Sequence, residues 1–205
     1  FWYDGEILKK GLPREDSLFK NADSVHKKIC SFYNVPEETH FILYAPTFRA
    51  NGSLSPYDMS YDNVISAITK ETGYPNIKNE DGTIQYGDDI LNGTQYSEIN
   101  DLILASDFLI TDYSSCMFDG MIAGKKVLIY ASDIDDYAKE RGYLFELEKL
   151  PFSISTTTNE LIRNICAFNQ NEYMQKVVSF QSSLGFVPGG NASEDVADFI
   201  IARMK

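Results

Sequence analysis

The sequence is poor in the residues that most often mark a metal or redox site. It holds only two histidines, and its three cysteines are widely spaced, with no Cys-x-x-Cys pair. An odd number of scattered cysteines argues against a disulfide framework and against a zinc site, and it suits a reducing compartment such as the cytoplasm. We therefore expect neither a bound metal nor a cofactor.

Basic residues are also scarce. There are 18 Lys and Arg against 30 Asp and Glu, which gives a formal net charge of -12. Such a surface would repel a nucleic-acid backbone and an anionic bilayer, so we expect no nucleic-acid partner. A site for an anionic substrate must then be local, built from helix N-termini, backbone N–H groups and a few arginines.

Long apolar runs, signal-peptide features and internal repeats are absent from the sequence. No stretch has the length that a membrane-spanning helix needs. The 205 residues suffice for one large domain with its own core. They could equally form one lobe of a larger enzyme. Because the first residue is Phe1 and not Met, we expect the chain to be a piece of a longer one.

Short apolar runs alternate with helical patterns along the chain. Continuous apolar runs at 41–45, 108–111 and 126–130 are typical of buried strands, and Ile7-Leu8 would open another. Helical periodicity covers 23–33, 60–71, 97–105, 115–124, 158–168, 170–184 and 193–204. This alternation predicts an α/β fold with a mainly parallel sheet and helices on both faces.

Helix ends are marked in two places. Gly124 stands where a glycine would stop the helix before the third strand, and Ser193 stands where it would cap the last helix. The stretch 73–96 departs from the pattern, because it is rich in Gly, Asn and Asp and holds no strong strand. We expect it to be loosely packed or poorly ordered.

The most informative motif is Leu109–Asp119, in which a strand ends at Thr111 and a helix begins near Ser114. In an open parallel sheet, ligands bind beyond the carboxyl ends of strands, and a helix N-terminus there offers N–H groups to a phosphate. Ser114 and Ser115 would add hydroxyl donors, and Asp119 could accept from ribose hydroxyls. Equally, Ser114 could be only an N-cap and Asp119 only a solvated helix residue.

A second motif, Tyr44–Arg49, also follows a strand. Thr47 offers a hydroxyl and Arg49 could clamp a phosphate with two hydrogen bonds, although a proline turn with a surface arginine would look the same. In a third motif, Gly11–Asp16, Arg14 is either a phosphate contact or a partner of Glu15 or Asp16.

A fourth motif, Asp133–Tyr137, is followed by Arg141-Gly142. It lacks the ligand spacing of an EF-hand, so a solvated charged rim is the favoured interpretation. His26 lies in a helical pattern and His40 opens a strand. Neither stands at the carboxyl end of a strand, so both are predicted to be non-catalytic.

Together these motifs resemble the CDP-glycerol glycerophosphotransferase family, which makes teichoic acids on a lipid-linked acceptor. The matching blocks run in the family's order over nearly the whole chain: Gly11–Asp16, Tyr44–Arg49, Ile110–Asp119, Asp133–Gly142 and Gly190–Ser193. The resemblance implies that residues 1–205 are a Rossmann-like lobe of a GT-B fold, namely the C-terminal lobe that binds the CDP part of the donor, and that the N-terminal lobe is not part of this sequence. It implies transfer of glycerol phosphate or ribitol phosphate from CDP-glycerol or CDP-ribitol, with CMP leaving.

The resemblance also implies site residues. Ser114 and Ser115 would meet the diphosphate and Asp119 the ribose, while Thr47 and Arg49 would lie in the donor region. The full expected substrate-binding set is Ser114, Ser115, Asp119, Thr47, Arg49, Asp112, Arg14 and Arg141. It further implies work at the cytoplasmic face of the membrane, with peripheral association through regions outside this chain.

Two histidine blocks of the family have no counterpart here. A Trp-His-Gly block would precede this chain, and an Arg-x-His-Pro strand should lie between Lys70 and the serine turn. The chain instead passes from Gly73 into Tyr74-Pro75-Asn76, so a strand is expected to be missing near 73–76 and no general base is identified. Two other hypotheses remain: a non-catalytic nucleotide-binding module, and another GT-B nucleotide-sugar transferase or epimerase.

Overall fold

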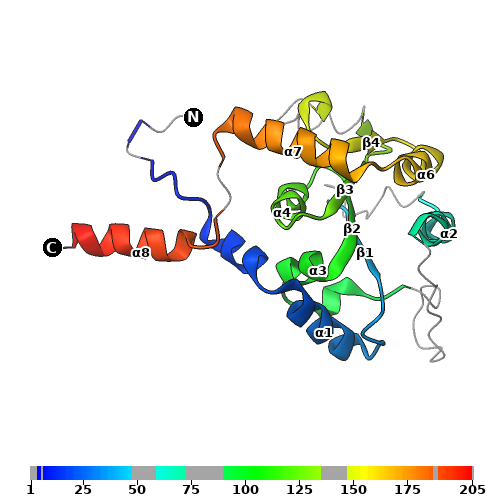
Figure 1. The fold of residues 1–205 in the computed structure, drawn as a ribbon, viewed down its shortest axis with the longest axis horizontal. Helices are drawn as coiled ribbons and strands as arrows, with labels where there is room; N and C mark the ends of the chain where they lie inside the picture. Colours follow the sequence, from blue (N-terminus) through cyan, green and yellow to red (C-terminus); the bar gives the residue numbers. More distant parts are fainter. Residues whose placement is uncertain are drawn as a thin grey trace.

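A computed structural model describes residues 4–5, 7–47, 59–72, 90–134, 147–186 and 189–204. These ranges contain a four-stranded sheet in the order β1-β2-β3-β4, in which every neighbouring pair is parallel. The strands are β1 (Phe41–Ala45), β2 (Ser106–Thr111), β3 (Lys126–Tyr130) and β4 (Ser153–Ser155). Helices lie on both sides of this sheet (Figure 1), so the predicted α/β architecture is confirmed.

The α-helices follow the predicted ranges to within a few residues. They are α1 (Ala22–Tyr33), α2 (Tyr61–Thr72), α3 (Ile99–Ala105), α4 (Cys116–Ile122), α6 (Thr158–Cys166), α7 (Gln170–Leu184) and α8 (Ala192–Arg203). Short 3-10 helices complete the described elements: η1 (Pro13–Phe19), η2 (Gly93–Gln95) and η3 (Leu147–Lys149). Gly124 takes a positive φ of 70° after α4, as expected of a glycine that ends a helix.

Strands β2 and β3 form the centre of the molecule and are apolar on both faces. Phe108 and Ile110 lie in one core cluster, while Leu109 lies in another on the opposite face of the same strand. Successive residues of a strand point to opposite faces, so a continuous apolar run is what a sheet covered on both sides requires. This is why the apolar runs could be identified as strands in the sequence.

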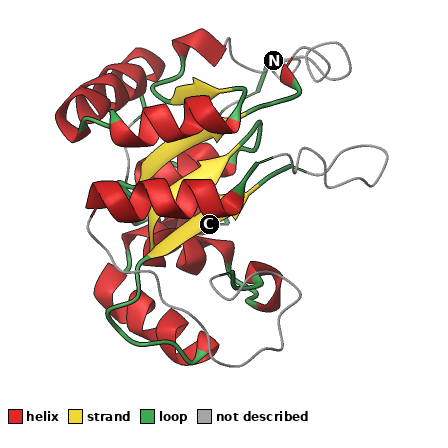
Figure 2. Ribbon diagram, turned by 90° about the vertical axis from the view of Figure 1, so that its right-hand side faces the viewer, coloured by secondary structure: helices red, strands yellow, loops and turns green. Residues whose placement is uncertain are grey.

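The two faces of the sheet carry different helices (Figure 2). Helices α2 and α6 pack through Val64, Ile68 and Leu161 on the face of Phe108 and Ile110. Helices α3, α4 and α7 cover the face of Leu109, and α1 packs against α3. The first described helix after β1 therefore lies on one face, and the helix after β2 lies on the other. Such a change of face between adjacent parallel strands is a topological switch point.

Helix α8 begins against the N-terminal segment and extends away from the sheet (Figure 1). Its first N–H groups, those of Ala192 and Ser193, donate to the carboxylate of Asp16 at 2.9 and 2.8 Å. The predicted cap by Ser193 is therefore wrong. The carboxylate comes from a distant segment and accepts two N–H groups, more than the single hydroxyl of a serine usually does.

Two further expectations need correction or stay open. The strand expected at Ile7-Leu8 does not form: neither residue pairs with any described strand, and Ile7 is exposed. Strand β4 was not anticipated, since a three-residue strand with two serines has no apolar run. Residues 73–89, with the missing strand expected near 73–76, lie outside the described residues and are untested.

None of the described helices has the length and hydropathy of a membrane span.

The contact between α4 and the sheet gives a test of the packing. A Cβ atom at Gly120 would lie 2.6 Å from Leu109 Cδ2 and 2.9 Å from Val127 Cγ2. Gly120→Ala should therefore lower the free energy of unfolding by about 1–3 kcal/mol, as overpacking does. Urea unfolding measures this, with Gly189→Ala as the control, because a Cβ there meets nothing within 4 Å. Equal stability of Gly120→Ala and the unaltered chain would contradict the packing described.

Candidate functional site at the carboxyl edge of the sheet

The loops that follow β1 and β2 meet at the carboxyl edge of the sheet. Ala45 pairs with Thr111 at the end of the ladder, so both chains leave the sheet at the same level. Just beyond, the N–H of Thr47 donates to both carboxylate oxygens of Asp112 at 2.9 Å, and its hydroxyl donates to Oδ1 at 2.6 Å. Asp112 is 1% exposed. Thr47 and Asp112, both predicted site residues, are therefore in contact, and their hydrogen bonds connect the loop after β1 with the loop after β2.

Beneath this pair, Thr111 links the same elements from within the core. Its hydroxyl donates to the carbonyl oxygen of Ala45 at 2.6 Å and lies 3.3 Å from the sulfur of Cys116. Burial raises the pKa of the Cys116 thiol, which keeps it protonated and unsuited to nucleophilic chemistry. Cys116 is therefore a packing residue at the start of α4.

The two serines of the turn differ in what their hydroxyls do. Ser114 is half-buried, and its Oγ accepts a long 3.4 Å hydrogen bond from the N–H of Cys116. Ser115 is the N-cap residue of α4 by position, but it is exposed and makes no side-chain cap hydrogen bond. Among the described residues, the Ser115 hydroxyl therefore has no hydrogen-bond partner, and it lies just beyond the carboxyl end of β2.

Asp119 and Arg14 come together on the side of α4. Asp119 lies four residues after Ser115, so the two share one face of the helix. Arg14 Nη1 donates to Asp119 Oδ2 at 3.0 Å, and this hydrogen bond raises the pKa of the arginine. The Asp119 side chain is 3% exposed and that of Arg14 is 52% exposed. The interpretation of Asp119 as a solvated helix residue is wrong.

One oxygen of the buried Asp119 carboxylate, Oδ1, has no hydrogen-bond partner among the described residues. The neighbouring Glu15 is also buried, and burial raises the pKa of its carboxyl; the charge of Arg14 opposes this rise and that of Asp119 adds to it. Arg14 thus provides positive charge to two buried carboxyl groups, Asp119 and Glu15. The alternative in which Arg14 only pairs with Glu15 or Asp16 is therefore incomplete.

A third loop, the one after β3, joins the edge through Tyr113. The tyrosine hydroxyl donates to Asp133 Oδ1 at 3.1 Å, which connects the loops after β2 and β3. The predicted arginines Arg49 and Arg141, together with the rest of the fourth motif from Asp135, lie outside the described residues.

Both histidines lie at the opposite edge of the sheet. His26 contacts the carbonyl oxygens of Ala105 and Glu37, and His40 contacts Asp107 at 2.9 Å, beside the amino-terminal starts of β1 and β2. This placement confirms that neither belongs to a carboxyl-edge site. Among the described residues, no group of three or more His, Cys, Asp or Glu side chains is arranged to hold a metal ion.

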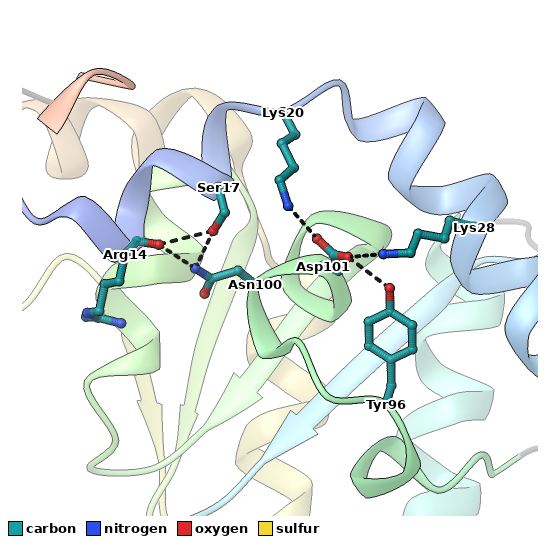
Figure 3. A network of polar contacts seen from close by, with 7 residues as sticks. All are labelled: Arg14, Ser17, Lys20, Lys28, Tyr96, Asn100 and Asp101. Carbon is teal, nitrogen blue, oxygen red and sulfur yellow. Dashed lines mark hydrogen bonds and ion pairs between the residues drawn. The ribbon is translucent and has the colours of Figure 1, made fainter. Parts of the chain in front are cut away.

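Sequence reasoning missed the polar contacts of α3, which hold η1 in place (Figure 3). Buried Asp101 accepts hydrogen bonds from Lys20, Lys28 and Tyr96, and neighbouring Asn100 donates to η1. The signal was present, because Asn100 and Asp101 lie one turn before the buried Ile103 and Leu104 and so fall on an apolar helix face.

Residues 1–202 match the family described as CDP-glycerol:poly(glycerophosphate) glycerophosphotransferase. The chain belongs to this family. The resemblance noted from the motifs is therefore confirmed.

The curated relatives of this chain carry the names of teichoic acid polymerases and transferases. A teichoic acid poly(glycerol phosphate) polymerase of Staphylococcus epidermidis is 32% identical over 100% of this chain and 31% of its own length. A poly(ribitol-phosphate) polymerase of Bacillus spizizenii is 29% identical over 95% of this chain and 33% of its own length. A teichoic acid glycerol-phosphate transferase of Staphylococcus aureus is 29% identical over 95% of this chain and 54% of its own length. The chain thus spans about a third to about half of these relatives.

Solved structures of the wall teichoic acid polymerase TagF share the fold. One variant aligns with a TM-score of 0.76 at 30% identity, covering 99% of this chain and 54% of that one. Another, soaked with CDPG, aligns with a TM-score of 0.75 at 32% identity, covering 99% and 52%. The predicted Rossmann-like lobe of a GT-B fold is confirmed by this likeness.

The contacts of Asp101 yield a pH-dependent prediction. Burial alone would raise its pKa, but hydrogen bonds from Lys28, Tyr96 and Lys20 outweigh burial and hold the pKa below its usual value. The carboxylate therefore stabilises the fold above its unfolded-state pKa of about 3.9, and this contribution is lost as pH falls through the lower folded-state pKa. Because both lysines are more than half exposed, Asp101→Asn should cost about 1–2 kcal/mol at pH 7.

Urea unfolding at a series of pH values checks this. The difference between Asp101→Asn and the unaltered chain should shrink toward pH 3. Glu37→Gln, which removes an exposed ion pair with Lys27, serves as the control and should change stability by under about 1 kcal/mol at any pH. A difference for Asp101→Asn that is the same at pH 3 and pH 7 would show that the charge of Asp101 does not matter.

Proposed function

We propose that the carboxyl edge between β1 and β2 binds the diphosphate of CDP-glycerol or CDP-ribitol. The observation that carries this is the topology: α2 and α4 lie on opposite faces after two adjacent parallel strands, and the crevice outside such a switch point is where open α/β sheets bind ligands. The exposed hydroxyl of Ser115 stands at this position.

Each residue has a role in this proposal. Ser114 and Ser115 donate hydroxyl hydrogen bonds to phosphate oxygens. Arg14 offers its remaining guanidinium N–H groups to the same anion, since Asp119 occupies only Nη1 and half of the side chain is exposed. Asp119, which the resemblance assigns to the ribose, instead acts through Arg14 because it is buried. In a chain of net charge -12, these local donors have to offset the general repulsion of a diphosphate.

Thr47 and Asp112 contribute to the site by fixing its walls. The N–H and the hydroxyl of Thr47 both donate to Asp112, so these groups are already used within the protein. Their contact holds the loop after β1 against the turn that carries the serines. Arg49, two residues beyond Thr47 in the sequence, and Arg141, in the segment between β3 and η3, would add positive charge near the donor.

The proposed reaction follows the names of the relatives and belongs to the intact enzyme. A hydroxyl of a teichoic-acid acceptor attacks the donor phosphate that bears the polyol. A new P–O bond forms to the acceptor, the P–O bond to CMP breaks, and the hydroxyl proton passes to a base. Positive charge and hydrogen-bond donors at the edge would stabilise the CMP leaving group. We propose a lipid-linked acceptor and a location at the cytoplasmic face of the membrane.

A second candidate is a lobe that binds the nucleotide without catalysis. It is favoured by the placement of His26 and His40, both at the edge remote from the serines. We therefore expect this chain alone to bind CDP-polyols and not to transfer the polyol phosphate. Turnover by this chain in the presence of acceptor would show that one of its own residues serves as the base.

Isothermal titration with CDP tests the site. Ser114→Ala/Ser115→Ala should weaken binding by about 1–3 kcal/mol, or about 5- to 150-fold, the usual effect of removing hydrogen bonds to a charged group. The matched control is Ser24→Ala/Ser31→Ala, two exposed serines of α1. Unchanged CDP affinity in the first variant would place the phosphates elsewhere. Tighter binding of UDP-sugars than of CDP-glycerol and CDP-ribitol would favour a nucleotide-sugar enzyme.

A further inference from the structure

Asn100 holds the main chain of the residue whose side chain reaches the proposed phosphate site. Its Nδ2 donates to the carbonyl oxygen of Arg14 at 2.9 Å and to Ser17 Oγ at 2.7 Å. Ser17 in turn donates to the same carbonyl at 3.1 Å. Figure 3 shows the Arg14 carbonyl turned toward Asn100 while its guanidinium extends away from this network.

The segment that carries Arg14 depends on such outside contacts. It is the 3-10 helix η1, which has no side-chain cap hydrogen bond at its N-terminus. Short 3-10 helices have poor internal hydrogen-bond geometry and rarely order themselves. Asn100 donates hydrogen bonds to η1 at Arg14 and Ser17. Lys20, at the end of η1, donates from its Nζ to Asp101 Oδ1 at 3.3 Å. Helix α3 therefore sets the position of η1.

Packing alone does not account for an asparagine at this position. Asn100 is 9% exposed, and its Oδ1 is buried without a partner among the described residues. An unsatisfied buried acceptor is costly, and a leucine of similar size would avoid that cost. What asparagine supplies, and leucine does not, is the amide that holds the Arg14 carbonyl.

We propose that Asn100 is a positioning residue for donor binding, acting through Arg14. This rests on the proposed function of the carboxyl edge. Asn100 fixes the backbone of Arg14, and Asp119 fixes one end of its guanidinium. The remaining N–H groups of Arg14 are thereby held at the face of α4 that Asp119 shares with Ser115. The ligand chemistry concerned is a nucleoside diphosphate, because the group that Asn100 orients is a phosphate-binding cation.

A double-mutant cycle read by titration tests this. The four proteins are the unaltered chain, Asn100→Ala, Arg14→Ala and the double variant, each titrated with CDP and with cytidine. Asn100→Ala should weaken CDP binding roughly 3- to 20-fold in the presence of Arg14 and less than about 2-fold in its absence, since coupled residues are not additive. Cytidine binding should not change, because cytidine has no phosphate.

Two further variants sharpen the cycle. Asn164→Ala is a chemically matched control, because this asparagine also donates to a carbonyl and a serine hydroxyl, those of Ile154 and Ser155, away from η1. It should leave CDP affinity unchanged. Should Asn100→Ala fail to fold, Asn100→Leu keeps the volume and removes the donor, and it should give the same loss of CDP affinity.

The outcomes separate the two proposals. Equal weakening by Asn100→Ala with and without Arg14 would overturn the positioning role and leave Asn100 a stabilising residue only. An Arg14→Ala variant that binds CDP normally while the double-serine variant does not would also overturn it, with the proposed site intact. No CDP binding by the unaltered chain would overturn the proposed function and this inference together.

Discussion

The hydrogen bonds between Thr47 and Asp112 join the ends of two adjacent strands, and the arrangement of the site depends on them. Because β1 and β2 are parallel and in register at Ala45 and Thr111, their following loops emerge side by side. A buried carboxylate needs donors, and Thr47 supplies both its N–H and its hydroxyl. The serine turn is thereby fixed at the start of α4, where Arg14 arrives from a segment about 100 residues earlier in the chain.

Much of the fold could be predicted from the sequence, because its main elements have simple physical signatures. The strands at 41–45 and 126–130 are continuous apolar runs with the predicted bounds, and helix α7 matches its predicted range. The strand predicted at 108–111 begins two residues earlier, at Ser106, because Ser106 and Asp107 are polar and do not extend the apolar run. What local patterns could not show were contacts over long sequence distance, such as the cap that Asp16 provides to α8.

The candidate site was predictable in composition and less so in geometry. Ser114, Ser115, Thr47 and Asp112 gather at one edge, as the strand ends indicated. The contacts of Arg14 beside this edge were not predictable, because sequence spacing does not show that Arg14 pairs with Asp119 or that Asn100 donates to the Arg14 carbonyl oxygen. Membership of the family, shown by the comparisons, is the basis on which the nucleotide and the reaction are proposed, because the geometry alone indicates only an anion site.

The central claim is that a nucleoside diphosphate binds at the carboxyl edge between β1 and β2. The most direct measurement is a 1H–15N NMR titration of this chain with CDP, read residue by residue. If CDP binds there, the largest shifts fall on the amides of Arg14, Thr47, Asp112 and Ser114 through Cys116, with little change at His26 and His40. Shifts gathered at the amino-terminal edge or along α8, with the serine turn unchanged, would contradict it.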